Sequence, residues 1–400
     1  MVKRASARLS ALSHRQKVVT ILLVGALVYG SFIVADGLVM RSVLDSSFGT
    51  TPDLQIYQDR TSVILNGGVL YRDLDSESPP LINYFLLPPQ IAGGAWWAYE
   101  IYFSMFSIMT GLVLYLAMRR WDENTAFFAA LLVVVSPYAV QDATWGIQDE
   151  PLVAFFFMLP AFLLLIGRAS SSAVAAMVGF WTKFLPVILY PLTLIMLEGR
   201  RERMKNLGIA VLASVVIALP FLLVCPIEFL NFPSYYLLGR SGEGSAGMSV
   251  LNMLSVGGLS LPGMFGAGLT VLVLLAAYYL VHRWNLDVWR GAMLITVMFL
   301  AVYPMIRLGY YIFPFVFFSV WAVRHKDVAL RLIPMYLTLL FGQALEQMGS
   351  HGHAFPYYWL LSAVLVLTGT LIMLDIAVRC LRKECFLDRT VREREGPPSA

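Results

Sequence analysis

Several acidic and basic side chains of this sequence stand in the polar segments between long apolar runs, and together they could act on a phosphate-bearing lipid. In chain order they are Asp53, Asp59, Asp149, Glu150, Lys183, Arg240 and Arg307. A carboxylate can take the proton from an acceptor hydroxyl as a general base, while ammonium and guanidinium groups can hold a phosphate as it leaves. The hydrocarbon of such a substrate would lie between apolar helices.

The most polar of these segments surrounds Asp53. Between residues 41 and 80 the chain has three basic residues and six acids, which gives a net charge of −3. Thr51 and Pro52 have the form of an N-cap and a first helical residue, and Gly67-Gly68 can end the helix in a left-handed turn. The spacing of Leu54, Tyr57, Thr61, Ile64 and Leu65 predicts one face of a short helix on the membrane surface. Asp53 lies in its first turn, where the helix dipole alone would also favour a carboxylate.

The composition predicts a protein with many membrane segments. Of its 400 residues 58% are hydrophobic and 14% are charged, and the apolar runs are long enough to cross a bilayer. The net charge of +4 does not indicate a nucleic-acid partner, because the basic residues collect in short loops beside apolar runs. The three cysteines are too few and too scattered for a disulfide framework or a metal site. The first seventeen residues hold five bases and no acid, which predicts a cytoplasmic N-terminus before an uncleaved first span.

The order of apolar runs and basic loops predicts an all-α polytopic bundle of about twelve membrane segments, with both termini in the cytoplasm. One of these segments would be the run 125–140. Residues 1–380 would form one transmembrane domain, and residues 381–400 a charged cytoplasmic tail. The outer loops would be residues 41–95, 141–150 and 225–262. The run Leu81–Leu87, which ends at Pro88-Pro89, is too short to cross and predicts a juxtamembrane helix on the outer side.

Lys183 falls in a stretch whose two flanks both look cytoplasmic. Arg168 precedes the apolar run 173–197 and Arg200 follows it. A single span cannot satisfy both flanks, so we expect two short helices that enter and return, broken near Lys183 and Pro186. An intramembrane lysine and non-helical backbone are tolerated where they line a polar cavity, which predicts such a cavity at Lys183.

Three groups of residues form motifs that follow one another along the chain. The first is the run Asp53-Leu54, Tyr57, Gly67-Gly68, Tyr71-Arg72-Asp73 and Pro79-Pro80-Leu81. The second is Trp145-Gly146-Ile147-Gln148-Asp149, and the third is Lys183 with Pro186 and Pro191. In this order they resemble the first-loop pattern, the W-G-Q-x-D motif of the second loop and the K-x-x-P helix break of the GT-C membrane glycosyltransferases, especially the polyprenol-phosphate-mannose-dependent type, with the glutamine of the second motif displaced by one position. The resemblance covers roughly residues 18–225, and the remainder matches only in topology.

This resemblance implies a GT-C-like fold and an enzyme that transfers a sugar, such as mannose, from a polyprenyl-phosphate donor on the outer face, with inversion. The acceptor would be a lipid, a glycan or a protein. Asp53 would be the general base, and Tyr57, Asp149 and Glu150 would contact substrate. Lys183, Arg240 and Arg307 would hold the donor phosphate, and the two arginines are chosen for their charge and expected side of the membrane more than for a motif. Some GT-C enzymes use a divalent metal, but the acids here are spread over two loops, so no metal or other cofactor is predicted.

Other interpretations of these residues remain open. A transporter or lipid flippase would equally have a broken helix and a buried lysine, although no inverted repeat is visible. A non-catalytic membrane subunit of a glycan assembly complex is a second alternative. Asp149 and Glu150 suit a helix start in any case, Lys183 could snorkel, and Arg240 could be a surface residue. His351 and His353 lack a third ligand, and Trp96-Trp97-Ala98-Tyr99-Glu100 has the position of an aromatic belt.

Overall fold

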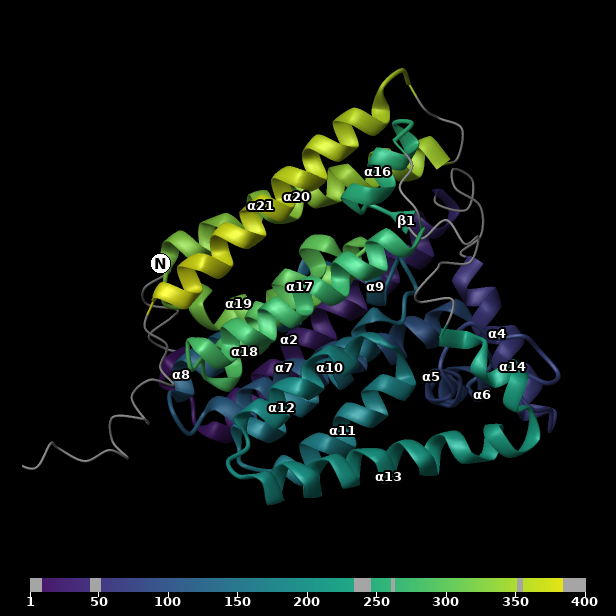
Figure 1. Cartoon of the computed structure of the whole chain (residues 1–400). Coiled ribbons are helices and arrows are strands. Elements are labelled where there is room, and N and C mark those ends of the chain that lie inside the picture. Colours follow the sequence, from purple (N-terminus) through teal and green to yellow (C-terminus); the bar gives the residue numbers. More distant parts are fainter. Residues whose placement is uncertain (1–8, 44–51, 234–245, 260–262, 351–354, 384–400) are drawn as a thin grey trace, which may run out of the picture.

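Six helices in the computed structural model are long and apolar enough to cross a membrane, within the residues that it describes (9–43, 52–233, 246–259, 263–350 and 355–383). They are α2 (His14–Ala35) with its continuation η1 (Asp36–Met40), α7 (Trp96–Met118), α13 (Arg200–Val224), α17 (Gly263–Arg283), α20 (Lys326–Ser350) and α21 (Tyr358–Arg382). Figure 1 shows α13 at one edge of the bundle and α20 with α21 at the opposite edge, with α2, α7 and α17 between them.

Shorter apolar helices complete this bundle. They are α8 (Glu123–Val134), α9 (Pro137–Ala143), α10 (Glu150–Leu165), α11 (Ala169–Thr182), η2 (Leu185–Leu189), α12 (Tyr190–Met196), α18 (Val288–Val302), η3 (Leu308–Tyr311) and α19 (Ile312–Ala322). The long and short helices together confirm an all-α polytopic membrane protein. The run 125–140, which we expected to be one span, is two helices bent by 41°, because Pro137 cannot continue the hydrogen bonding of α8.

Short helices extend one end of the bundle. They include α4 (Pro52–Leu65), α5 (Pro80–Phe85), α6 (Leu87–Ile91) and α14 (Pro226–Leu230), which Figure 1 shows together at that end. The short helices predicted within residues 41–95 are therefore confirmed. Thr51, the expected N-cap of α4, lies outside the described residues. Tyr57 and Thr61 are buried, whereas Leu65 is exposed, so the apolar face of α4 ends one turn earlier than its spacing suggested.

Stacked aromatic side chains fill the centre of the bundle between α10, α18 and α19. The rings of Phe157 and Phe313 lie 4.6 Å apart, and those of Phe162 and Trp289 lie 5.9 Å apart. The outward faces of the peripheral helices instead expose leucine and valine, and the Val216 side chain of α13 is 65% exposed. Such a surface is stable against lipid tails, because helices satisfy their own backbone polar groups there.

The helix ends opposite α4 and α5 carry most of the basic residues of the interhelical turns. The start of α2 lies beside the end of α7, because the His14 ring and the Tyr115 hydroxyl are hydrogen-bonded at 2.9 Å. The end of α21 lies beside the start of α18, where Arg290 donates to the Lys383 carbonyl at 2.6 Å. The first and last described helices thus begin and end on the same side of the bundle.

A buried ion cluster joins the two ends of the first outer loop. Arg41, just after η1, donates to Asp36 at 2.6 Å and to Glu100 of α7 at 3.0 Å. Both carboxylates are fully buried, and the Arg41 guanidinium also lies 5.3 Å from the Trp96 ring. The chain therefore leaves the bundle and returns to it at one point, which fixes where the loop with α4 begins and ends.

Replacing Arg41 by methionine should lower the free energy of unfolding by about 3–5 kcal/mol, because two buried carboxylates would lose their counter-charge. Thermal unfolding in detergent measures this as a lower midpoint. Arg72→Met is the matched control, because Arg72 pairs with Asp73 on an exposed surface and its loss should leave the midpoint unchanged. Equal midpoints for the two variants would show that the cluster does not stabilise the loop.

Candidate functional site

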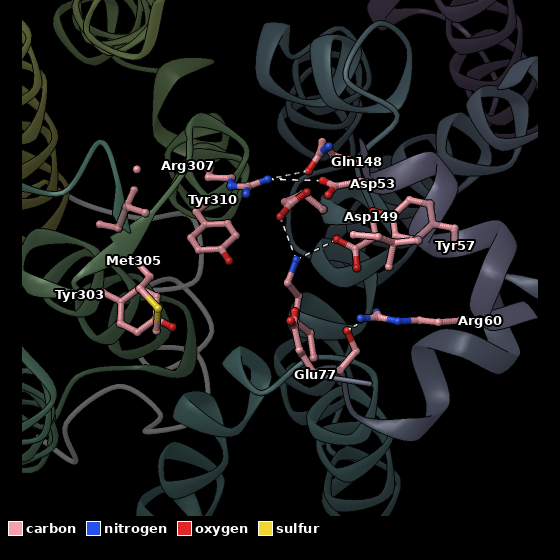
Figure 2. Close-up of a pocket in the computed structure, with 16 residues that line it drawn as sticks. Asp53, Tyr57, Arg60, Glu77, Gln148, Asp149, Tyr303, Met305, Arg307 and Tyr310 are labelled. Carbon is pink, nitrogen blue, oxygen red and sulfur yellow. Dashed lines mark hydrogen bonds and ion pairs between the residues drawn. The ribbon is translucent and has the colours of Figure 1, made fainter. Parts of the chain in front are cut away.

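One cavity of about 190 Å³ lies between α4 and the turn before α19. Its polar and aromatic lining comes from segments far apart in the sequence (Figure 2). The lining residues are Asp53, Ile56, Tyr57, Arg60, Glu77, Ser78, Gln148, Asp149, Glu150, Lys183, Gly247, Tyr303, Met305, Ile306, Arg307 and Tyr310.

Helix α4 supplies one wall of the cavity. Asp53, Ile56, Tyr57 and Arg60 share one face of the helix, because Ile56 and Tyr57 stand three and four residues after Asp53 and four and three residues before Arg60. Tyr57 is buried and stacks on Tyr99 at 6.0 Å between ring centroids. Burial, and then the negative charges of Asp149 and Asp53, raise the pKa of Tyr57 well above its ordinary value. Its phenol therefore faces the cavity as a neutral hydroxyl.

The turn between α9 and α10 supplies the second wall. Ile147 has φ of +44°, which is unusual for a β-branched residue, and its side chain is fully buried. The backbone turns at this point, and the next residues, Gln148, Asp149 and Glu150, line the cavity. Asp149 is the N-cap of α10 and Glu150 is its first residue. Both acids therefore have the favourable helix-start position expected from the dipole, and they face the cavity as well.

Lys183 bridges these two acids. Its ammonium nitrogen lies 2.8 Å from Asp149 Oδ1 and 2.8 Å from Glu150 Oε1, and its side chain is 13% exposed. It also lies 5.5 Å from the centroid of the Tyr310 ring. An ammonium held in this way does not snorkel toward lipid headgroups, which was the alternative for this residue.

The predicted helix break places Lys183 in the cavity wall. Lys183 is the C-cap of α11, with extended backbone (φ −151°, ψ 145°), and η2 begins two residues later. The returning segment packs closely on α11, because a Cβ at Gly179 would lie 2.8 Å from Pro186 Cβ and 3.0 Å from the Phe156 carbonyl. The absence of a side chain at residue 179 therefore permits the tight hairpin that carries Lys183.

Arg307 enters the cavity from the opposite side to α4 (Figure 2). Its Nη1 lies 3.4 Å from Asp53 Oδ2 and 3.5 Å from Gln148 Oε1. The Arg307 side chain is 64% exposed. An exposed ion pair at this distance contributes about 1 kcal/mol or less, so an incoming substrate can replace it at little cost.

Two hydrogen-bonded contacts position Arg307. The strand β2 (Met305–Ile306) pairs in parallel with β1 (Ala246–Gly247), and the Leu308 amide donates to Gln343 Oε1 at 2.6 Å. Gly247 has φ of +64°, and a Cβ there would overlap the Ile306 carbonyl oxygen. A glycine is therefore required where the two strands meet, one residue before Arg307.

We expect Gly247→Ala to reduce the activity of this site at least about 10-fold, because the new methyl group must push β2 and Arg307 away from Asp53. The matched control is Gly258→Ala, which also has positive φ (+92°) but no atom within 4 Å of the added carbon. Turnover and thermal midpoint should be measured for both variants. Equal turnover in the two would mean that the close approach at Gly247 does not position the site.

Asp142 is a further buried acid beside the cavity, although it does not line it. The residue is 6% exposed, and its Oδ2 has no hydrogen-bond partner in the described part of the chain. A Cβ at Gly309 would overlap that oxygen and would lie 2.9 Å from Glu150 Cγ. The sequence placed Asp142 in an outer loop, but it lies within α9 and is covered by the η3 turn.

The residues expected to bind substrate mostly converge on this cavity. Asp53, Tyr57, Asp149, Glu150, Lys183 and Arg307 all line it. Asp59 is exposed and does not line it, because it lies on the outward face of α4. Arg240, His351 and His353 lie outside the described residues. Among the described residues no group of three histidine, cysteine or acidic side chains is arranged to hold a metal ion.

The sequence did not single out Arg60 or Tyr310. Arg60 could have been found from its spacing, because it stands seven residues after Asp53 and so two helical turns further along the same face. Tyr310 could not, because only the fold of the η3 turn brings its ring to Lys183.

Residues 77–226 match the protein family described as dolichyl-phosphate-mannose-protein mannosyltransferase. The matched segment contains the second-loop motif and the helix break at Lys183, and it begins after Asp53. This match supports a membrane glycosyltransferase of the GT-C mannosyltransferase type. No curated protein matches the chain.

Proposed function

We propose that this membrane protein transfers a sugar, a hexose such as mannose, from a polyprenyl-phosphate donor to an acceptor hydroxyl, with inversion. The observation that carries the proposal is the convergence of Asp53, Lys183 and Arg307 on one cavity from three distant segments. The family match over residues 77–226 supports the reaction class independently, because it does not include Asp53.

In the proposed reaction the acceptor oxygen attacks the anomeric carbon of the donor. Asp53 takes the hydroxyl proton, and the bond between the anomeric carbon and the phosphate oxygen breaks. The phosphate leaves with the bonding electron pair, so the products are a glycoside and a polyprenyl phosphate. Lys183 and Arg307 add positive charge to the cavity as a whole, which attracts the anionic donor.

The other lining residues orient the reactants in this proposal. Asp149 and Glu150 hold Lys183 in place and shape the acceptor side, and the neutral Tyr57 hydroxyl can hydrogen-bond a sugar. The cavity of about 190 Å³ is smaller than the roughly 300–1,000 Å³ of pockets for drug-sized ligands. It would admit the polar headgroup of the donor, while the polyprenyl chain would stay among the membrane helices.

We propose that the cavity faces the outer side of the membrane and that both termini are cytoplasmic. The support is the separation of charge: basic turns gather at the end of the bundle where α2 begins and α21 ends, and basic loops face the cytoplasm. The acceptor would accordingly be a lipid, glycan or protein outside the cytoplasm.

Purified protein in lipid vesicles tests this proposal against the transporter and the non-catalytic subunit. With a polyprenyl-phosphate donor labelled in its sugar, and a mixture of lipid and glycan acceptors, we expect label to appear in a new glycoside and free polyprenyl phosphate to be released in equal amount. Movement of intact labelled donor across the vesicle membrane without release of polyprenyl phosphate would instead support a flippase. If the protein neither transfers sugar nor moves the donor, the result would support the non-catalytic subunit.

A further inference from the structure

Arg60 is a buried cation in the cavity wall that has no acidic partner in the part of the chain that the structure describes. The residue is 8% exposed, and its Nη1 donates to Ser78 Oγ at 2.8 Å. Among the described residues it forms no ion pair with a carboxylate, although Glu77 lines the same cavity. Figure 2 shows its guanidinium directed into the cavity from α4.

The other two described cations of the cavity each face acidic groups. Lys183 lies 2.8 Å from two carboxylates, and Arg307 lies 3.4 Å from Asp53. A buried charge without a counter-charge is costly, because little of its hydration is replaced. An anionic ligand in this cavity would therefore supply the counter-charge that Arg60 lacks among the described residues.

The position of Arg60 relative to Asp53 suits an inverting displacement. In such a reaction the base and the leaving group lie on opposite sides of the anomeric carbon. Arg307 contacts Asp53 and so lies on the side of the base. Arg60 stands two turns further along α4, which is about 10.5 Å along the helix axis at 1.5 Å per residue. A sugar ring could lie between them.

We propose that Arg60, with the hydroxyl of Ser78, binds the phosphate that leaves the donor. Ser78 Oγ accepts a hydrogen bond from Arg60, so its own hydrogen is available to a phosphate oxygen. A guanidinium can bind a phosphate through two parallel hydrogen bonds. This assignment rests on the proposed sugar transfer for the direction of attack, but the binding of a phosphate-bearing lipid can be measured without any reaction.

The test compares the binding of a short-chain polyprenyl phosphate with that of the neutral polyprenol to the full chain in detergent. We expect wild-type protein to prefer the phosphate, and Arg60→Gln to lose at least about 10-fold of that preference while its affinity for polyprenol stays unchanged. Arg60→Gln should also have an equal or higher thermal midpoint, since it removes a buried charge, whereas loss of a merely structural arginine would lower it. Arg72→Gln, on the exposed surface of the same loop, is the matched control and should behave as wild type.

Two further measurements test the assignment. Inorganic phosphate should compete with polyprenyl phosphate in wild type and not in Arg60→Gln, if the headgroup alone is recognised. Ser78→Ala should weaken phosphate binding a few-fold and leave polyprenol binding unchanged. If folded Arg60→Gln keeps the wild-type preference for the phosphate, the assignment is wrong. If Arg60→Gln does not fold, the same preference in Ser78→Ala would overturn the assignment. Wild-type protein that binds polyprenyl phosphate through Arg60 but transfers no sugar would refute the proposed function and leave the phosphate site intact.

Discussion

Replacing Asp53 by asparagine should reduce sugar transfer about 10³-fold, while the thermal midpoint stays close to that of wild type. The size follows from the usual contribution of a positioned general base, which is about 10²–10⁴-fold. Asparagine has nearly the same shape as aspartate but cannot accept the proton of the acceptor hydroxyl. The midpoint should change little because the only ion pair of Asp53 in the described residues is the long, exposed contact with Arg307.

Asp59→Asn provides the matched control for this experiment. Asp59 lies on the same helix and undergoes the same chemical change, but it is exposed and does not line the cavity. Its turnover should equal that of wild type. Initial rates at saturating donor measure the effect, because a lost base lowers kcat and does not simply raise the KM of either substrate. An Asp53→Asn enzyme that turns over normally would remove Asp53 from the reaction.

Replacing Lys183 by methionine should produce the largest loss of stability at the site, about 3–5 kcal/mol in the free energy of unfolding. The change removes the ammonium that lies 2.8 Å from both Asp149 and Glu150, and these carboxylates are nearly buried. The two acids would then repel each other in a region with little water. We expect a lower thermal midpoint and the loss of sugar transfer together.

Two further variants separate charge balance from packing. The triple variant with Lys183→Met, Asp149→Asn and Glu150→Gln removes the repulsion and should recover most of the thermal midpoint without recovering activity. Lys205→Met is the control for an exposed lysine and should unfold as wild type. If Lys183→Met alone were as stable as wild type, the double ion pair would not be a source of stability.

Local sequence patterns predicted the parts of the site that depend on one segment. Pro52 and Gly67-Gly68 bounded the helix that carries Asp53, and α4 spans Pro52–Leu65. Basic residues on both flanks predicted a hairpin with Lys183 at its tip, and the structure has the helix break at that residue. Both predictions succeeded because glycines and prolines act over a few residues.

The contacts between distant segments could not be predicted in this way. Arg307 was chosen from its charge and its expected side of the membrane, and its place beside Asp53 depends on the pairing of Gly247 with Ile306. The Arg41 cluster was not predicted. Its two acids, Asp36 and Glu100, stand 64 positions apart in the chain, and no periodicity links them. The bend at Pro137 was missed because the apolar run continues through it.

The cluster of Arg41 with Asp36 and Glu100 also marks where this protein could be recombined with others. The ion pairs of Arg41 with Asp36 and Glu100 hold the two ends of residues 42–95 together at the bundle. A chimaera joined outside residues 36–100 would keep all three residues of the ion cluster from one protein. A chimaera joined between them would pair an arginine from one protein with acids from the other. Transplanting residues 42–95 together with residues 36–41 and 96–100 would therefore move this segment with its own ion cluster.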